Sequence, residues 1–204
     1  MAKTKQKIMD TARQLYNRYG LANVSQRQIA EQLGISPGNL TYHFKKKEDL
    51  NLAIYEALVG DFNALFQQLD IDNQSTQFFA KFIDGMYEVM QQYRFIFVDI
   101  IFLMRTHPTI ANHYRDLLVL RKQQFNVIII TLIKKGYWRP APFPDYYDTV
   151  FQQLQLVTDF YCSAQELNSF LKEGQDKTHF RRLIQQTIEP HLTVSGKSSL
   201  GMSL

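Results

Sequence analysis

The sequence predicts an all-α fold, and two kinds of observation indicate it. Apolar residues recur three and four positions apart along most of the 204-residue chain, which is the spacing of one face of a helix. Residue types that begin and end helices stand between these stretches, among them Ser25, Gly34 and Ser36. We therefore expect about nine helices, divided between a head (residues 1–46) and a body (residues 47–193).

The composition excludes several classes of protein. Hydrophobic residues make up 45% of the chain and aromatic residues 13%, which is enough for a packed core and excludes global disorder. The single cysteine, Cys162, excludes an internal disulfide framework and a cysteine-rich metal site, and it fits a reducing compartment. Neither a signal peptide nor an apolar stretch of about 18 residues is visible, so we expect a cytoplasmic protein without a membrane segment.

The positive charge is concentrated in the head. Residues 1–50 carry nine Lys and Arg against four Asp and Glu, a net charge of +5, whereas the other 154 residues carry 14 against 15. A basic segment on a near-neutral body suggests that one end of the molecule meets a polyanion. On charge alone, the alternative to a polyanion-binding surface is a charged face that is simply exposed to solvent.

The head contains signals for three short helices. Apolar spacing predicts the first helix over residues 4–19, followed by Gly20 as a C-cap. Ser25 and Gln28 have the spacing of a capping box that opens a second helix, which ends at Gly34. Ser36 followed by Pro37 opens a third helix, which extends to residue 44.

The second and third helices, joined by a short turn that contains glycine, have the form of a helix-turn-helix over about residues 25–44. Its second helix enters the major groove of DNA. Asn39 and Thr41 face outward and can reach base edges, whereas Tyr42, His43 and Lys47 offer donors to phosphates. A hairpin inside an ordinary bundle is the alternative, and the adjacent run of three lysines at 45–47 argues against it.

Residues 24–44, with Lys47-Glu48-Asp49-Leu50 after them, resemble the DNA-binding region of TetR/AcrR-type bacterial transcriptional regulators, and the resemblance extends over about residues 4–60. The shared features are Ile-Ala in the second helix, the Gly-Ile-Ser turn and Gly-x-Leu-x-x-His-Phe in the third. Thr41 and Pro37 depart from the usual pattern, so the resemblance implies no operator sequence. Taken together, the predicted DNA contacts are Ser25, Gln26, Arg27, Ser36, Pro37, Gly38, Asn39, Thr41, Tyr42, His43 and Lys47.

The body is predicted to be helical throughout. Periodic apolar residues predict helices from residue 47 to about 70, from 75 to 92, from 108 to 135 and from 146 to 171. A last helix, which includes Phe180, is predicted to end at about residue 193. The stretch 95–104 is apolar on every side and is predicted to be one buried helix. Residues 136–144, with prolines at 140, 142 and 144, form a loop, and residues 194–204 are predicted to be a flexible tail.

The last two helices can complete the core or pair with a second subunit. Their placement resembles that of the dimerisation helices of the same family, which implies a homodimer on a palindromic operator. The predicted interface residues are Val150, Leu154, Val157, Tyr161, Phe180, Leu183, Ile184, Thr187, Ile188 and His191.

Asp99 stands out because its helical neighbours are all apolar, so it needs a tertiary partner, a ligand or a raised pKa. One interpretation is a structural contact with another helix, for example through Arg94, Arg105 or Arg121. The other is a pocket for a small apolar or cationic molecule. The residues predicted to line that pocket are Phe82, Met86, Met90, Asp99, Phe102, Tyr114, Phe125 and Tyr161.

No catalytic, cofactor-binding or metal-binding motif is visible, and the five histidines lack the spacing of metal ligands. The sequence therefore predicts a homodimeric regulator of transcription at the nucleoid, most simply a repressor that a ligand releases from DNA. Two alternatives stay open: a ligand-independent DNA-binding or architectural protein, and a helical small-molecule-binding or enzymatic protein whose basic head is incidental.

Overall fold

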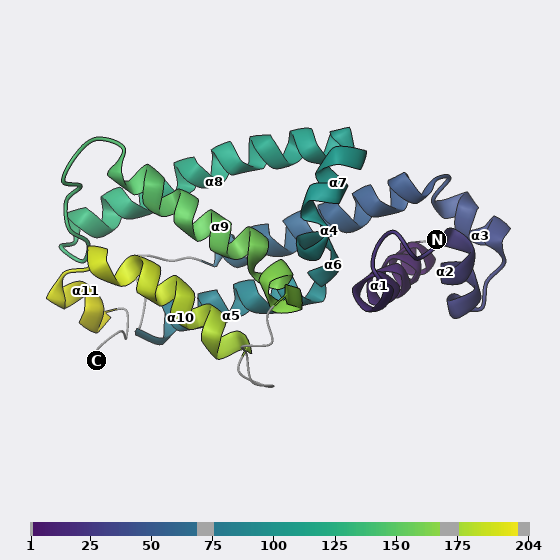
Figure 1. The fold of residues 1–204 in the computed structure, drawn as a ribbon, viewed down its shortest axis with the longest axis horizontal. Coiled ribbons are helices and arrows are strands. Elements are labelled where there is room, and N and C mark those ends of the chain that lie inside the picture. Colours follow the sequence, from purple (N-terminus) through teal and green to yellow (C-terminus); the bar gives the residue numbers. More distant parts are fainter. Residues whose placement is uncertain (1, 69–75, 168–175, 200–204) are drawn as a thin grey trace.

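The computed structural model describes residues 2–68, 76–167 and 176–199, and within these ranges it is built of helices (Figure 1). Eleven α-helices and one short 3-10 helix lie in the described part of the chain, and nine of the α-helices have seven or more residues. The predicted all-α class is confirmed. The head lies at one end of an elongated molecule, and a long helix joins it to the body (Figure 1).

The head consists of α1 (Ala2–Tyr19), α2 (Gln26–Leu33) and α3 (Pro37–His43). The capping signals act as predicted. Ser25 and Gln28 form a capping box, and Gly34 ends α2 with a φ of 70°, in the left-handed region that glycine adopts without strain. Ser36 caps α3, and Pro37 stands in its first turn.

Apolar side chains from all three helices pack together in the head, in a core that continues into the body. Ile8, Tyr16, Ile29 and Leu40 have no exposed surface. Phe44, just after α3, is 3% exposed and closes this core, as its spacing from Leu40 predicts. Burial of these side chains fixes α3 in place, so its polar face is held toward solvent.

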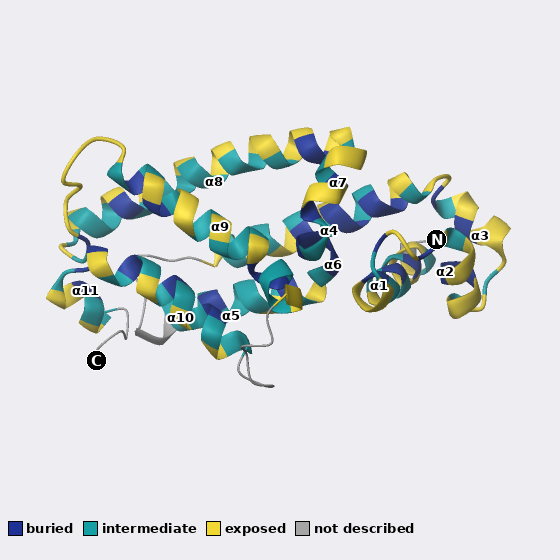
Figure 2. Ribbon diagram, in the orientation of Figure 1, coloured by how far each residue is buried: buried dark blue, intermediate teal, exposed yellow. Residues whose placement is uncertain are grey.

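Five long helices form the body. They are α4 (Lys47–Gln67), α5 (Thr76–Gln92), α8 (Pro108–Lys134), α9 (Tyr146–Leu167) and α10 (Asp176–Ile188). Helices α8 and α9 form one long side of the body and α5 and α10 the other, while α4 extends from the head into the space between them (Figure 1). Buried residues line the inward faces of these helices and exposed residues their outward faces (Figure 2).

The stretch 95–104 is not the single buried helix that its composition predicts. It is divided into α6 (Arg94–Val98) and α7 (Ile100–Thr106), with Asp99 between them in a non-helical conformation. Ile101 and Phe102 are 49% and 46% exposed. A short helix packed against the body on one side leaves its other side in solvent, so the apolar composition overstated its burial.

The C-terminal end is also more ordered than predicted. A 3-10 helix (Glu189–His191) leads to α11 (Val194–Ser199). The N–H of Thr193 donates to the carbonyl of Tyr137 at 3.0 Å, and a Cβ on Gly196 would come within 2.0 Å of that same carbonyl oxygen. The glycine thus permits α11 to pack directly on the backbone of the loop after α8. Residues 200–204, and the boundaries predicted near residues 71–75 and 171, lie outside the described residues.

None of the described helices combines the length and the apolar character needed to cross a membrane.

Candidate functional site

The outward face of α3 presents the predicted recognition surface. Pro37, Gly38, Asn39 and Thr41 are exposed, and Tyr42 is 72% exposed. His43 is half-buried and lies edge-on to the ring of Tyr42, with 5.2 Å between ring centroids. The helix is seven residues long, so these side chains form a compact patch of the size that enters a major groove.

Both serines predicted to contact DNA are helix caps. The Oγ of Ser25 accepts a hydrogen bond from the backbone N–H of Gln28 at 3.3 Å, and the Oγ of Ser36 accepts one from the N–H of Asn39 at 3.2 Å. The positive ends of α2 and α3 therefore lie at the surface, beside exposed Arg27 and Asn39. Such helix ends attract phosphate groups.

Three of the other predicted DNA contacts are engaged inside the head. Gln26 donates through Nε2 to the carbonyl of Phe44 at 2.9 Å, and the Oγ1 of Thr41 donates to the carbonyl of Pro37 at 3.1 Å. Lys47 donates through Nζ to the carbonyl of Leu21 at 2.6 Å, and burial lowers its pKa. These side chains stabilise the head, and contacts from them to DNA stay a prediction.

The fold also brings α1 to this surface, a contact that the sequence does not predict. The Nζ of Lys5 lies 5.4 Å from the ring centroid of Phe44, and Lys5, Tyr42, His43 and Lys45 surround one shallow hollow. The only sequence signal for this arrangement is the excess of positive charge in residues 1–50.

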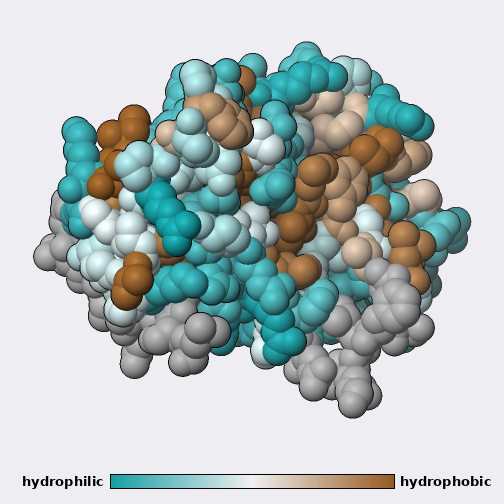
Figure 3. Space-filling view, turned by 60° about the vertical axis from the view of Figure 1, so that its left-hand side comes forward, coloured by the Kyte–Doolittle hydropathy of each residue, from teal (hydrophilic) through white to brown (hydrophobic). Residues whose placement is uncertain are grey.

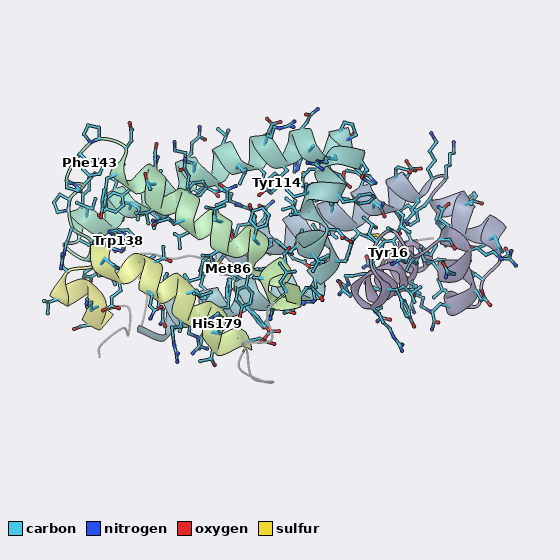
Figure 4. The ribbon with its side chains drawn as sticks, viewed as in Figure 1. Tyr16, Met86, Tyr114, Trp138, Phe143 and His179 are labelled. Carbon is cyan, nitrogen blue, oxygen red and sulfur yellow. The ribbon has the colours of Figure 1, made fainter. Side chains whose placement is uncertain are left out.

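The body encloses a second candidate site, a cavity of about 290 Å³. It lies between the inward faces of the body helices, and Met86, Tyr114 and Trp138 reach it from three separate segments (Figure 4). Apolar and aromatic side chains dominate its lining. The aromatic members are Tyr55, Phe62, Phe66, Phe79, Phe82, Phe97, Tyr114, Phe125, Trp138 and Phe151.

Half of the predicted ligand-binding residues lie at this cavity. Phe82, Met86, Tyr114 and Phe125 line it. The other four lie elsewhere: Met90 and Tyr161 are buried in the core, Phe102 is exposed on α7, and Asp99 faces the head. Because Asp99 does not line the cavity, the expectation of a cationic ligand loses the carboxylate on which it was built.

Another carboxylate, Asp159 of α9, does line the cavity. It accepts a short hydrogen bond from the hydroxyl of Tyr114 and a second from the Nε2 of Gln155 at 3.3 Å. Burial raises the pKa of Asp159, although both hydrogen bonds oppose that shift. Burial also raises the pKa of Tyr114, and the neighbouring Asp159 adds to that rise. Burial thus disfavours the charged forms of both groups.

Asp99 connects the body to the head instead. Its Oδ2 accepts from the backbone N–H of Leu21 at 3.4 Å, so its partner is a backbone group and not one of the arginines considered above. Asn17 of α1 makes a further connection: its Nδ2 donates to the carbonyl of Gln92 at 2.9 Å, and its Oδ1 accepts from the N–H of Phe95 at 3.0 Å. Two side chains thus hold the head against the segment α5–α7.

The predicted dimer residues mostly pack the core of the chain itself. Val150, Tyr161, Phe180, Ile184 and Ile188 are 5% exposed or less, and His191 is 8% exposed. Leu154 lines the cavity, and Val157, Leu183 and Thr187 are half-buried. Most of this amphipathic stripe therefore packs within the chain, whereas Val157, Leu183 and Thr187 keep partly exposed surface, and their place in a dimer interface stays a prediction.

Other apolar residues are exposed on the outer faces of α8 and α9. They are Val119, Leu120, Val127 and Ile130 on α8, and Leu156, Phe160 and Leu167 on α9. Leu156 is 60% exposed and Val127 63%. Apolar side chains reach the surface of the body in several patches, and the largest in the view of Figure 3 is a continuous band. Large exposed apolar patches mark interaction surfaces.

Within the described residues, no group of three or more His, Cys, Asp or Glu side chains could hold a metal ion. Cys162 has no exposed surface, and burial raises the pKa of its thiol to about 11. A thiol in that state is a poor nucleophile, so Cys162 acts as a core residue.

Comparison with protein families gives two matches that together cover most of the chain. The model described as "Bacterial regulatory proteins, tetR family" matches residues 8–54. The model described as "Bacterial transcriptional repressor" matches residues 60–200. The boundary between the two matches lies within α4, the helix that joins head and body.

Among curated proteins, the chain is similar to HTH-type transcriptional regulators of Staphylococcus aureus. It is 35% identical over 71 residues to one from strain bovine RF122 and 34% identical over 87 residues to one from strain USA300. These alignments cover 35% and 43% of this chain, and the chain spans 38% and 42% of the two relatives.

Two solved structures are similar over nearly the whole chain. A TetR-family transcriptional regulator from Marinobacter aquaeolei matches with a TM-score of 0.83 and 23% identity, covering 98% of this chain and 96% of that one. A putative transcriptional regulator from Saccharomonospora viridis, solved in complex with choline, matches with a TM-score of 0.73 and 22% identity, covering 94% and 98%. At these identities the likeness shows a common fold.

Proposed function

Because the chain belongs to the TetR family of bacterial transcriptional regulators, we propose that it is a repressor that a small molecule releases from a palindromic operator. As a helix-turn-helix regulator of this family it is a DNA-binding protein and not an enzyme. The proposal concerns three further points: the ligand response, the homodimer and the direction of regulation. Its site of action is the nucleoid, in the bacterial cytoplasm.

One observation carries the ligand response: the segment α6–α7 contacts both the cavity and the head. Ile96, Phe97 and Ile100 line the cavity, while Asp99 and the backbone N–H of Phe95 in the same segment bind α1 and the turn after it. A ligand that moves the first set of residues would strain the second. This shared segment supports a coupling between the cavity and the head.

Helix α4 makes a second connection, because its first residue contacts the head and residues further along it line the cavity. Its first residue, Lys47, holds the carbonyl of Leu21 in the head, and Tyr55, Leu58 and Phe62 further along the helix line the cavity. A packed helix transmits a displacement as a rigid body. Ligand binding thus favours a body state in which the two heads of a dimer are wrongly spaced for DNA, and DNA and ligand weaken each other's binding by the same factor.

The exposed apolar faces of α8 and α9 support a homodimer. Val119 and Val127 on α8, with Leu156 and Phe160 on α9, give the chain an outer surface that a second copy would cover. A twofold dimer presents one head to each half of a palindrome, with the half-sites about 34–36 Å apart or a multiple of that distance. This proposal places the interface on the outer faces of α8 and α9, whereas the sequence prediction placed it on the stripe of α9 and α10.

The predicted ligand is a small apolar or cationic molecule, and the cavity lining supports the apolar part of that prediction. The related regulator from Saccharomonospora viridis was solved with choline, a cation, and aromatic walls such as those of Phe62 and Phe66 suit a cation as well. A ligand-independent DNA-binding or architectural protein is the competing function.

The experiment is a binding titration of the purified chain against the DNA upstream of its own gene, followed by a screen of small molecules for release. The proposal requires binding to a twofold-symmetric fragment and at least one cavity ligand that weakens it. Binding to DNA that no cavity ligand alters identifies the ligand-independent protein instead. A scrambled fragment of the same base composition is the control.

A further inference from the structure

The cavity in the body has an asymmetric set of polar groups. Its described lining residues include one basic and one acidic side chain, Arg121 of α8 and Asp159 of α9, and the rest of the lining is uncharged and mostly apolar or aromatic. They do not form an ion pair with each other, since no contact within 4.0 Å joins them. Which of the two lacks a partner decides the charge of the complementary ligand.

Asp159 is already satisfied. Its carboxylate accepts hydrogen bonds from Tyr114 and Gln155, and burial raises its pKa. Both effects reduce its need for a cation, because a protonated carboxyl group carries no charge and a hydrogen-bonded carboxylate is partly neutralised.

Arg121, in contrast, has no charged partner among the described residues. Its guanidinium donates to two neutral oxygens, the Oδ1 of Asn63 and the Oε1 of Gln124, and stacks over the ring of Phe66 at 4.2 Å. No described carboxylate lies within ion-pair distance of it, and burial lowers its pKa. A half-buried guanidinium that has only neutral partners retains an uncompensated charge, and planar guanidinium groups bind carboxylates strongly.

Trp138 carries a buried donor that has no acceptor among the described residues. The residue is 4% exposed and lines the cavity, and its Nε1 is buried with no hydrogen-bond partner among the described residues. That nitrogen is buried and not open to the cavity, so the charge of Arg121 is the feature that favours a ligand with negative charge.

The cavity is also elongated. Its lining on α8 extends from Tyr114 to Leu132, which corresponds to about 27 Å of helix at 1.5 Å per residue. Arg121 lies between those ends, beside the half-buried Asn63 and Gln124. Arg121 is itself half-buried, so its guanidinium is partly solvated, and the apolar lining of the cavity continues along α8 on both sides of it.

We propose that this cavity binds an elongated organic anion, whose carboxylate or equivalent acidic group pairs with Arg121 and whose apolar chain lies along α8. The inference rests on the proposed function and replaces the predicted apolar or cationic ligand by an amphipathic anion. Ligand binding would supply the counter-ion that the described residues do not give Arg121.

The chain contains a single tryptophan, and it lines the cavity, so its fluorescence reports occupancy directly. Three probes of equal chain length differ only in the head group: decanoate, 1-decanol and decyltrimethylammonium. We expect decanoate to bind at least about tenfold more tightly than decanol, as a charge-assisted hydrogen bond adds that much, and the ammonium to bind most weakly. Equal affinities, or tightest binding of the ammonium, would overturn the proposal.

Substitution separates the role of Arg121 from general effects of charge. Arg121→Gln should weaken decanoate binding about tenfold and leave decanol binding unchanged, and Arg121→Lys should retain part of the preference. Arg115→Gln removes an exposed arginine from the same helix and should change neither affinity. If Arg121→Gln weakens all three probes equally, the residue shapes the cavity and does not select the anion. Thermal unfolding of each variant shows that it is folded.

The failure of this inference differs from the failure of the proposed function. Decanoate that binds to the cavity without weakening DNA binding supports the anion site and contradicts the ligand response. A cationic ligand that releases DNA supports the response and contradicts the anion site.

Discussion

At the scale of single residues, several side chains predicted to contact DNA have a second task in the fold. The sequence shows which face of α3 is polar, because Leu40 and Phe44 mark its buried side. It does not show that Gln26 reaches the carbonyl of Phe44 or that Lys47 reaches that of Leu21. These partners lie 18 and 26 positions away in the chain, and spacing rules describe only neighbours within a helix.

Asp159 gives a prediction about pH. Its pKa is raised in the folded state above the ordinary value of 3.8, so folding favours the protonated form. The stability gained in this way is present below pH 3.8 and is lost as the pH rises through the raised pKa. We therefore expect Asp159→Asn, whose oxygen still accepts from Tyr114 and Gln155, to be more stable than the wild type at neutral pH.

Urea denaturation at a series of pH values measures this difference in the free energy of unfolding. The advantage of Asp159→Asn should shrink toward zero as the pH falls to about 4. The matched control is Asp148→Asn, since Asp148 lies on the same helix, is paired with Lys122 at 2.6 Å and should lose stability at neutral pH. An Asp159→Asn variant less stable than the wild type at pH 7 would contradict the raised pKa.

At the scale of helices, capping residues and apolar spacing predicted α1 to α4 and α8 well, because both signals are local. The stretch 95–104 was mispredicted because composition cannot tell a helix buried on every side from two short helices with one exposed side. The stripe on α9 and α10 raises a related difficulty. Periodicity shows that a face is buried, but not whether the core of the chain or a second subunit covers it.

The contact between α1 and the α5–α6 junction leads to a prediction about signalling. Asn17→Ala removes the hydrogen bonds to Gln92 and Phe95 that hold the head to this junction. DNA affinity without ligand should change little, because Asn17 is not on the α3 surface. The factor by which a cavity ligand weakens DNA binding should fall several-fold. The coupling free energy between two such sites is about 1–3 kcal/mol, and the variant removes one of the contacts that carry it.

DNA-binding titrations with and without ligand provide the measurement. Asn23→Ala is the control, since Asn23 is also exposed and donates to the carbonyl of Tyr19 within the head. It should leave the coupling factor as it is in the wild type. A coupling factor equally unaffected by Asn17→Ala would contradict a role of the Asn17 hydrogen bonds in signalling.

At the scale of the whole molecule, the exposed outer faces of α8 and α9 predict how two copies meet. Val119→Asp combined with Leu156→Asp places charge on side chains that are 59% and 60% exposed in one copy. Each buried apolar side chain contributes about 1.5–3 kcal/mol. The dissociation constant of the dimer should therefore rise about a hundredfold or more. Light scattering over a range of concentrations measures the shift.

Phe143→Asp serves as the control for that experiment. Phe143 is 59% exposed but lies in the loop between α8 and α9. It should leave the dimer intact. If the double variant stays dimeric while Phe143→Asp dissociates, the interface lies at the loop end of the body and not along the two helices.

The charge of the molecule is polarised along its length. The basic residues of the first 50 positions gather in the head, at the end of the molecule remote from the α8–α9 loop (Figure 1). Sequence counting gave this asymmetry, whereas the position of Lys5 beside α3 needed the fold. In a dimer both basic heads would face the DNA, and binding would depend strongly on salt.

The most direct test of the central claim is a footprint of the full chain on the DNA upstream of its own gene, at several salt concentrations. The account predicts two symmetric protected half-sites about 34–36 Å apart or a multiple of that distance. It also predicts that affinity falls with salt by a logarithmic slope of about −0.9 for each phosphate contacted. Absence of protection at low salt, or protection without twofold symmetry, would contradict it.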